Sequence, residues 1–197
     1  MARDPGTLAL LAYDRLCVFE YAIAVEVFAL VRPALGVPWY RAVTVSPDAG
    51  PARGIGGVRV EADAPLSALG RARTIVIPGW RHRDGPAPPA LLARLRAAHR
   101  RGARLLSICS GAFLLAEAGL LDGRRATTHW LYADEFKARF PAVTFVDDVL
   151  YVDEGPIITS AGSGAGIDAS LHLVRRDFGA KVANTVARRM VIPPHRE

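Results

Sequence analysis

Short apolar runs of strand length alternate along this chain with segments of helical periodicity. The strand-like runs are residues 7–13, 40–46, 54–60, 74–77, 104–108, 143–146, 150–152 and 157–159, and the helical segments are residues 21–30, 89–101, 110–118, 130–140, 167–178 and 180–190. Because strands that alternate with helices usually pair in parallel through crossovers, the pattern predicts an α/β fold whose mostly parallel central sheet has helices on both faces. No repeat, linker or low-complexity segment interrupts the pattern, so we expect residues 1–197 to form a single domain.

The composition is that of a folded globular protein. Of the 197 residues, 51% are hydrophobic, which is enough for a substantial core. The chain has no run of about 18 uncharged apolar residues that would cross a bilayer, and its first apolar stretch is too short for a signal peptide. We therefore expect a cytoplasmic protein with no membrane partner. The two cysteines, Cys17 and Cys109, are too few for a disulfide framework or a four-cysteine zinc site.

One segment joins a strand-like run directly to a helix. In residues 105–113, LLSICSGAF, Cys109 stands at the junction, at the carboxyl end of a central strand and beside a helix N-terminus. This order of residues is typical of a nucleophile elbow with cysteine in the place of serine, and Gly111 allows the sharp turn. Because the helix end favours a thiolate, we expect a lowered pKa for this thiol. The alternative is that Cys109 is a small core residue.

The formal net charge of +6 raises the question of nucleic-acid binding. The basic residues are almost all arginines, and they alternate with apolar residues at helical spacing, as on solvated helix faces. A weak polyanion footprint is the alternative. The closing pair of helices, residues 167–178 and 180–190, is the only candidate for a helix-turn-helix, and its apolar positions are better suited to covering a sheet. The sequence therefore predicts no sequence-specific DNA binding by this chain alone.

Several motifs spread over nearly the whole chain belong together. They are FE at 19–20, AVEVF at 24–28, VIPGW at 76–80, ICSGAF at 108–113, GLLDGRRATTHW at 119–130, TSAG at 159–162 and VIPPHR at 191–196. Together they resemble the ThiJ/PfpI family of class I glutamine-amidotransferase-like domains, and more narrowly the N-terminal sensor domain of AraC-type transcriptional regulators. The resemblance implies a flavodoxin-like sandwich, which agrees with the predicted alternation. Isonitrile hydratases of the same superfamily share the cysteine elbow and the ATTHW segment.

The resemblance gives catalytic-type roles to Cys109, Glu20 and His129. It implies that Cys109 is the nucleophile and that Glu20, at the start of the first helix, hydrogen-bonds to its sulfur. It also implies that His129 lies near the cysteine and serves as base or orienter. Two alternatives remain open. In the alternative for Glu20, it is only a first-turn carboxylate favoured by the helix dipole. In the alternative for His129, it is a partly buried histidine that is hydrogen-bonded to the backbone.

Gly79, Trp80 and Ser110 are expected to line the same pocket. Residues 78–80 end a strand beside the elbow, so the amides of Gly79 or Trp80, with that of Ser110, would form an oxyanion hole. Many enzymes of the family have a second glycine at the position of Trp80. The tryptophan therefore argues against enzymatic access and suits an aromatic pocket wall.

Three weaker patterns are interpreted as structural. Residues 162–166, GSGAG, resemble a phosphate cradle but lack the GxGxxG spacing, so we expect the start of a helix there. Cys17 is expected to be a loop or core thiol, and His172 to form a structural pair with Asp168. No third ligand accompanies that pair, so the sequence predicts neither a metal nor an organic cofactor.

Two classes of function follow from the resemblance. The favoured one is a ligand- or redox-sensing domain of an AraC-type regulator, with an unidentified small-molecule ligand. In that family DNA is bound through a helix-turn-helix domain, which is absent from this chain. The alternative is a stand-alone cysteine-dependent enzyme, such as an isonitrile hydratase-like or amidase-like hydrolase. Because members of the family are commonly dimers, we also expect a homodimer.

Overall fold

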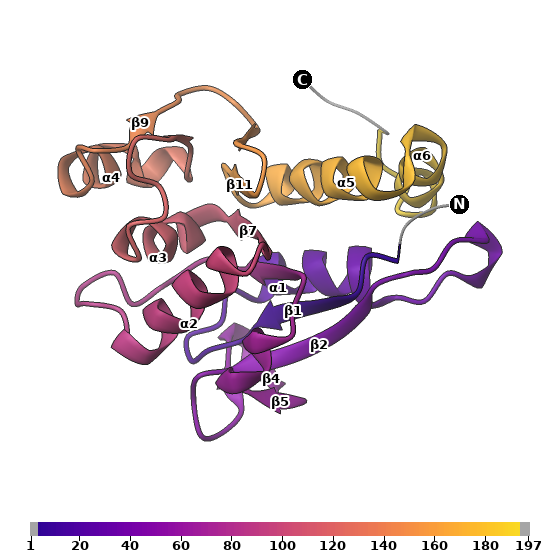
Figure 1. The fold of residues 1–197 in the computed structure, drawn as a ribbon, viewed down its shortest axis with the longest axis horizontal. Helices are drawn as coiled ribbons and strands as arrows, with labels where there is room; N and C mark the ends of the chain where they lie inside the picture. The colour runs from indigo at the N-terminus through magenta and orange to yellow at the C-terminus, as the bar shows by residue number, and fades with distance from the viewer. Residues whose placement is uncertain (1–3, 194–197) are drawn as a thin grey trace.

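A seven-stranded sheet forms the centre of the molecule (Figure 1), in a computed structural model that describes residues 4–193. Its strands lie in the order β10-β11-β7-β6-β1-β2-β5. Their bounds are Thr7–Leu11 for β1, Arg41–Ser46 for β2, Ala64–Pro65 for β5, Thr74–Ile77 for β6, Arg104–Ile108 for β7, Tyr151–Asp153 for β10 and Ile157–Ser160 for β11. Neighbouring strands are parallel, except that β10 and β11 are antiparallel. The predicted mostly parallel central sheet is confirmed.

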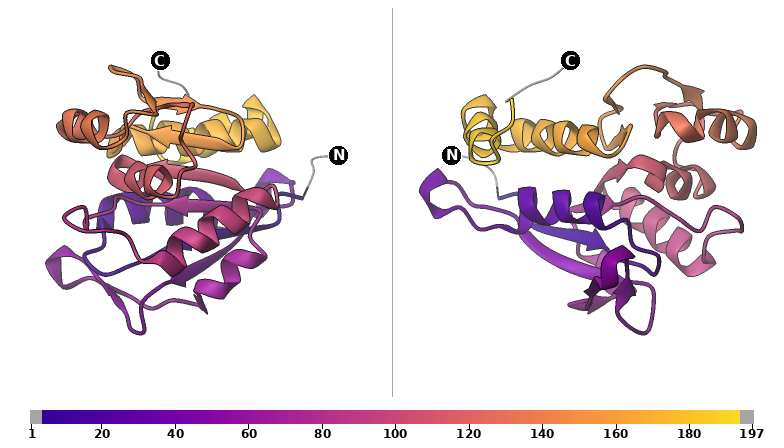
Figure 2. Two further views of the ribbon diagram at one scale, coloured as in Figure 1. Left: turned by 60° about the vertical axis from the view of Figure 1, so that its left-hand side comes forward. Right: turned by 180° about the vertical axis from the view of Figure 1, so that it is seen from behind.

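Helices cover both faces of the sheet (Figure 2). The helices α1 (Val18–Ala24), α5 (Gly164–Phe178) and α6 (Ala180–Arg189) pack on one face. The helices α2 (Pro89–Arg100) and α3 (Ala112–Glu117) pack on the other, and α4 (Ala133–Arg139) adds Phe136 to the same cluster. This arrangement agrees with the predicted helices on both faces.

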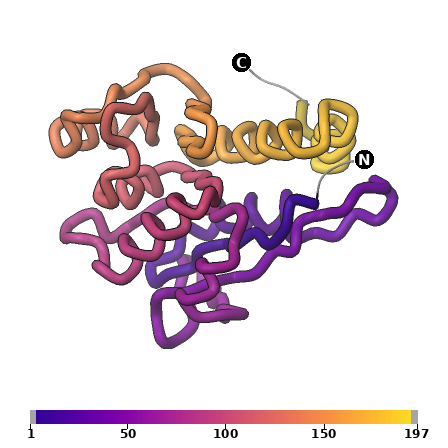
Figure 3. Tube along the Cα trace, in the orientation of Figure 1, coloured from indigo at the N-terminus to yellow at the C-terminus, as the bar shows by residue number. Residues whose placement is uncertain are grey.

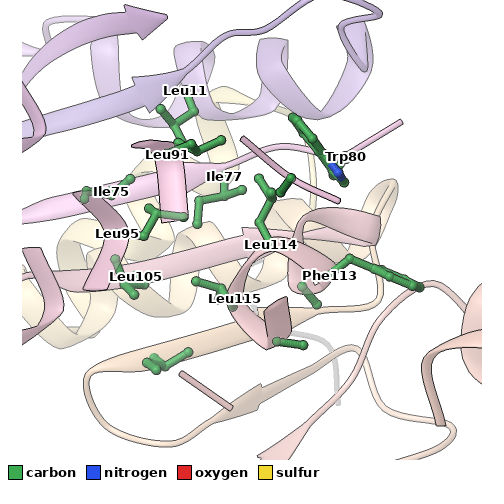
Figure 4. Close-up of a cluster of buried hydrophobic side chains, with 14 of the residues drawn as sticks. Leu11, Ile75, Ile77, Trp80, Leu91, Leu95, Leu105, Phe113, Leu114 and Leu115 are labelled. Carbon is green, nitrogen blue, oxygen red and sulfur yellow. The ribbon is translucent and has the colours of Figure 1, made fainter. Parts of the chain in front are cut away.

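The alternation of side chains along each strand divides the core into two layers. Leu8 and Leu10 of β1 point into the layer under α1, α5 and α6, whereas Ala9 and Leu11 point into the layer under α2 and α3. Figure 4 shows part of the second layer, where Leu11, Ile75, Ile77 and Leu105 of the strands meet Leu91 and Leu95 of α2 and Leu114 of α3. Since both faces are buried, the central strands carry apolar side chains on both faces, as residues 8–11 of β1 and 75–77 of β6 do.

The first helix differs from its prediction at both ends. It begins at Val18, three residues before the predicted start, and it continues as a π-helical turn over Val25–Ala29. The guanidinium of Arg32 donates hydrogen bonds to the carbonyl oxygens of Glu26, Val27 and Leu30 at 2.7 to 3.0 Å. Arg32 therefore satisfies the carbonyls that the end of a helix leaves without partners.

Small elements account for most other differences. The predicted strand at residues 54–60 is a pair of two-residue antiparallel strands, β3 (Ala52–Arg53) and β4 (Arg59–Val60). The predicted strand at residues 143–146 contains β9 (Thr144–Phe145), which pairs with β8 (Arg125–Ala126) outside the central sheet. The edge strand β5 was not predicted. It is two residues long and contains proline, which is tolerated at a sheet edge but does not indicate a strand in a sequence.

The polarity of the sheet gives the molecule two distinct ends. The start of β1 and helix α6 lie at the same end (Figure 3). Because the central strands are parallel, their carboxyl ends all point to the opposite end, where ligand sites of open α/β sheets are usually found. Among the described residues no helix is both long and apolar enough to span a bilayer.

Candidate functional site

The residues predicted for the site come together where three neighbouring strands end. Cys17 and Glu20 follow β1, Gly79 follows β6 and Cys109 follows β7. Because β1, β6 and β7 are adjacent and parallel, these segments meet at one edge of the sheet although they are far apart in the sequence.

The backbone at Cys109 forms a strained turn. Its φ is 58°, in the left-handed region that residues other than glycine rarely adopt. A short 3-10 helix over Cys109–Gly111 connects β7 to α3, so the predicted helix at residues 110–118 begins as a tighter turn. Strain of this kind is characteristic of a nucleophile elbow, in which the backbone holds one side chain at the top of a strand.

Two glycines allow other segments to approach this turn closely. A Cβ atom on Gly111 would lie 2.5 Å from the carbonyl oxygen of Ile77, and one on Gly162 would lie 2.4 Å from the Cβ of Cys109. Real Cβ atoms do not come this close to other heavy atoms. The packing around the elbow therefore requires glycine at both positions.

The Cys109 thiol is buried, with 7% of the residue exposed. Burial and the nearby charge of Glu20 raise its pKa to about 12, although hydrogen bonds from the backbone and side chain of Ser110 act in the opposite direction. The prediction of a lowered pKa was therefore wrong. The helix-end amide does stabilise the thiolate, but loss of hydration in a buried site outweighs it.

Glu20 lies in the first turn of α1, and it too is 7% exposed. Its negative charge raises the pKa of Cys109 and also that of Cys17. Glu20 thus acts on Cys109 through its charge, whereas its hydrogen bond is with Cys17. The hydrogen bond to Cys109 that the resemblance implies stays a prediction.

Cys17, which was expected to be a loop or core thiol, belongs to the site. Its buried sulfur accepts a hydrogen bond from Nε of Arg81 at 3.0 Å. A Cβ on Gly79 would lie 2.7 Å from that sulfur and 3.4 Å from Oγ of Ser110. The side chain of Ser110 in turn forms a hydrogen bond with the thiol of Cys109. Burial is the largest cause that raises the pKa of Cys17, and Arg81 opposes it. The spacing to Glu20, three residues along a helix, was the signal that would have pointed to this cysteine.

The segment before His129 is bonded to the elbow. Oγ1 of Thr128 donates a 2.8 Å hydrogen bond to the carbonyl oxygen of Cys109, and the amide of Thr127 donates to Oγ1 of Thr159 on β11. His129 is partly exposed, and its Nδ1 accepts the amide of Leu131 at 3.2 Å. This bond corresponds to the backbone-bonded alternative for His129, and it occupies one of the two ring nitrogens.

The structure places the Trp80 side chain in the core. Trp80 is 3% exposed and packs edge-on against Tyr13, with ring centroids 4.8 Å apart, in the layer under α2 and α3 (Figure 4). Tyr13 in turn donates a 2.5 Å hydrogen bond to the carbonyl oxygen of Pro78. The indole thus fixes the segment that carries Gly79, and Gly79 itself lies beside Ser110.

The weaker patterns have structural roles. Gly162 has a φ of 88°, and α5 starts at Gly164, as expected for the start of a helix. His172 does form a structural pair, but its Nε2 bonds to Asp153 of β10 at 2.6 Å. Within residues 4–193, no group of three or more His, Cys, Asp and Glu side chains is arranged to hold a metal ion. The residues 194–196 of the last family motif lie outside the described part of the chain.

Comparison with known proteins identifies relatives of two kinds. Residues 9–176 match the DJ-1/PfpI family. The chain is 37% identical over 153 residues to the HTH-type transcriptional regulator CdhR of Pseudomonas aeruginosa, covering 78% of this chain and 45% of CdhR. It is 26% identical over 189 residues to the HTH-type regulator GbdR of the same species, covering 96% of this chain and 51% of GbdR. It is also 39% identical over 88 residues to the isonitrile hydratase of Pseudomonas putida, covering 45% of this chain and 37% of that enzyme.

Solved structures share the fold. An AraC family transcriptional regulator from Pseudomonas putida superposes with a TM-score of 0.81 at 20% identity, covering 94% of this chain and 100% of that one. Drosophila melanogaster DJ-1beta superposes with a TM-score of 0.80 at 18% identity, covering 98% and 100%. The two regulators matched by sequence are about twice as long as the region that this chain covers.

Proposed function

The chain belongs to the DJ-1/PfpI family, and from that premise we propose that it is the ligand- or redox-sensing domain of an AraC-type transcriptional regulator. The observation that carries the proposal is the extent of similarity to regulators. The match to GbdR covers 96% of this chain but only 51% of GbdR. The remaining half of such a protein is long enough for a helix-turn-helix domain, through which DNA would be bound.

The surroundings of Cys109 support ligand sensing more than turnover or thiol oxidation, because both of these reactions need the thiolate. The sulfur is buried, and its pKa of about 12 leaves very little thiolate at neutral pH. Trp80 packs against Tyr13 in the core layer under α2 and α3. We propose Cys109 and Glu20 as the centre of the sensing pocket, with Gly79 and Ser110 in its lining. His129 and Trp80 border it, and the domain functions as a cytoplasmic homodimer.

The gene that encodes this chain provides the first test. We expect the reading frame to continue into a helix-turn-helix region. A reporter fused to the promoter that the complete regulator binds would then compare the natural protein with Cys109→Ser. The variant should still bind the promoter but should lose the response to the inducing ligand or oxidant. A frame without a helix-turn-helix region would remove the proposal.

A stand-alone enzyme is the second candidate, and the similarity to isonitrile hydratase favours it. In that case the Cys109 thiol would add to the terminal carbon of an isonitrile, and water would release the N-substituted formamide. The test incubates the purified protein with an alkyl isonitrile and follows the formamide product. Turnover that is abolished in Cys109→Ser would establish the enzyme, whereas no turnover would leave the sensing domain as the function.

A further inference from the structure

A small open cavity at the surface has three exposed arginines in its lining. Its volume is about 320 Å³, and its lining consists of Asp14, Arg15, Leu16, Arg53, Gly54, Ile55 and Arg81. Three arginines and one aspartate are in this lining, so it has an excess of positive charge. The volume is at the lower end for small-molecule sites, which suits a compact ligand better than a polymer.

Two of these arginines are without partners. In the described part of the chain, the guanidinium groups of Arg15 and Arg53 donate no hydrogen bond and form no ion pair. A larger cavity of about 490 Å³ at the other end of the sheet provides a contrast. It is lined by Arg73, Arg101, Arg104 and Arg176, each of which already donates to a carbonyl or carboxylate. Of these two cavities, only the smaller is lined by arginines whose guanidinium groups have no partner at all among the described residues.

The loops that carry these arginines are held in place by specific contacts. Leu16 donates a 2.7 Å backbone hydrogen bond to Arg53, and a parallel bridge joins Leu16 to Gly54. A Cβ on Gly54 would lie 2.3 Å from a methyl carbon of Val18, so the close approach of the two loops requires glycine. Arg15 has a φ of 59°, a strained conformation of the kind that is retained at functional sites.

Arg81 connects the cavity to the two buried thiols. It lines the cavity, and its Nε donates a hydrogen bond to the sulfur of Cys17. Glu20 raises the pKa of both Cys17 and Cys109. A ligand that binds the terminal nitrogens of Arg81 would therefore act directly on the surroundings of the thiols. A molecule bound in the cavity would contact a side chain that already bonds to one of the two thiols.

We propose that this cavity binds the oxyanion group of a small ligand, a carboxylate or a phosphate, through Arg15, Arg53 and Arg81. The planar fork of a guanidinium matches both groups with two parallel hydrogen bonds. That the bound anion is the signal rests on the proposed sensing function, whereas anion binding itself does not. The proposal names the class of ligand that the domain detects.

The first experiment measures binding to the purified 197-residue protein. Thermal unfolding is followed with increasing sodium acetate or sodium phosphate, against sodium chloride at equal ionic strength and against acetamide as a neutral analogue of acetate. Acetate, phosphate or both should raise the unfolding temperature in a saturable way, and acetamide should not. A response to one anion alone identifies the ligand group as carboxylate or phosphate.

Variants separate the cavity from general salt effects. The double variant Arg15→Gln/Arg53→Gln should weaken anion binding by about a hundredfold, because each of the two lost charged hydrogen bonds costs roughly tenfold. The matched control, Arg94→Gln, removes a charge from an exposed position of α2 and should bind as the natural protein does. Arg15→Lys/Arg53→Lys controls for a folding defect, because it keeps both positive charges and removes only the planar guanidinium groups. Equal binding by all four proteins, or no saturable binding, would overturn the proposal.

The second experiment tests the connection to the thiols. Bound anion should slow the alkylation of Cys17 by iodoacetamide, because it shields Arg81, whose charge favours the Cys17 thiolate. The effect should be absent in Arg15→Gln/Arg53→Gln. Both experiments are made without DNA. A complete regulator that ignored the anion at its promoter would therefore contradict the proposed sensing function and not the anion site.

Discussion

At the scale of single residues, the charge of Glu20 governs two sulfurs at once. It raises the pKa of Cys109 and that of Cys17, and burial of each thiol acts in the same direction. Opposing influences are local to each sulfur, namely Ser110 at Cys109 and Arg81 at Cys17. The reactivity of the site therefore depends first on the burial of each thiol, and then on the balance between one shared carboxylate and two separate donors.

Replacing Glu20 by glutamine tests this balance. Glu20→Gln should lower the pKa of Cys109 from about 12, so the thiolate population at any pH below that value should increase. For each unit by which the pKa falls, the alkylation rate should rise by about tenfold, and the rate profile should move to lower pH. Iodoacetamide labelling followed by peptide mass spectrometry measures the rate at Cys109. Glu61→Gln, at an exposed position, is the control. An unchanged profile would mean that Glu20 is only a first-turn carboxylate.

At the scale of elements, the site depends on short connections that follow the strands. The turn after β7 holds Cys109 in a left-handed conformation, and the turn after β11 brings Gly162 against it. Each connection uses a glycine where a side chain would collide. The helices and strands supply the frame, and these turns set the distances within the site.

Gly162→Ala should destabilise the fold by more than about 3 kcal/mol. The substitution combines an unfavourable positive φ with a methyl group 2.4 Å from the Cβ of Cys109. The matched control is Gly123→Ala, which has a φ of 70° and open space around its Cβ position. Its expected cost is about 1 kcal/mol. Urea unfolding gives both values, and equal losses would show that the approach to the elbow is not tightly packed.

Arg32 is expected to stabilise the end of the first helix. Arg32→Ala should lower the free energy of unfolding by about 2 to 4 kcal/mol, because three carbonyl oxygens lose a buried charged donor. Glu26 pairs with the same guanidinium, but its side chain is 51% exposed. Glu26→Ala should therefore cost less than about 1 kcal/mol. Urea unfolding of the two variants distinguishes backbone capping from the surface ion pair, and similar losses would contradict the capping role.

At the scale of the whole molecule, we expect a homodimer. Several large apolar side chains are exposed, among them Phe19 at the start of α1 and Trp130 and Leu131 after the elbow-bound segment. Exposed apolar groups of this size are often covered by a partner. Light scattering of the purified protein should give about twice the chain mass of 21.2 kDa. A mass of one chain at micromolar concentration would contradict the prediction.

DNA binding by this chain alone should be weak and independent of sequence. The closing helices α5 and α6 use Leu171, Val174 and Val186 to cover the sheet, and the exposed side of α6 offers only a few basic residues, among them Arg188 and Arg189, for phosphate contacts. The net charge of +6 would give only phosphate contacts, which weaken steeply with salt. A mobility-shift assay at about 150 mM salt measures this. A discrete complex with one promoter fragment, stable against excess random DNA, would contradict the sensing-domain proposal.

The sequence by itself determined the frame of the molecule. The long runs with clear periodicity, such as those of β1, β7, α2 and α5, could be located because periodicity is a local property. The elbow at Cys109 was also evident, since a strand that meets a helix at cysteine is a local pattern. Two-residue elements such as β5 and β8 could not be located, because too few residues carry their signal.

Only the tertiary structure decided how the site works. The burial that raises the pKa of Cys109, the pairing of Cys17 with Arg81 and the core position of Trp80 each depend on segments far apart in the chain. Helix-end electrostatics are visible in a sequence, whereas loss of hydration is a property of the assembled packing. Local patterns in the sequence therefore determine the helices and strands, whereas the chemistry of the thiols depends on which strand ends become neighbours in the folded protein.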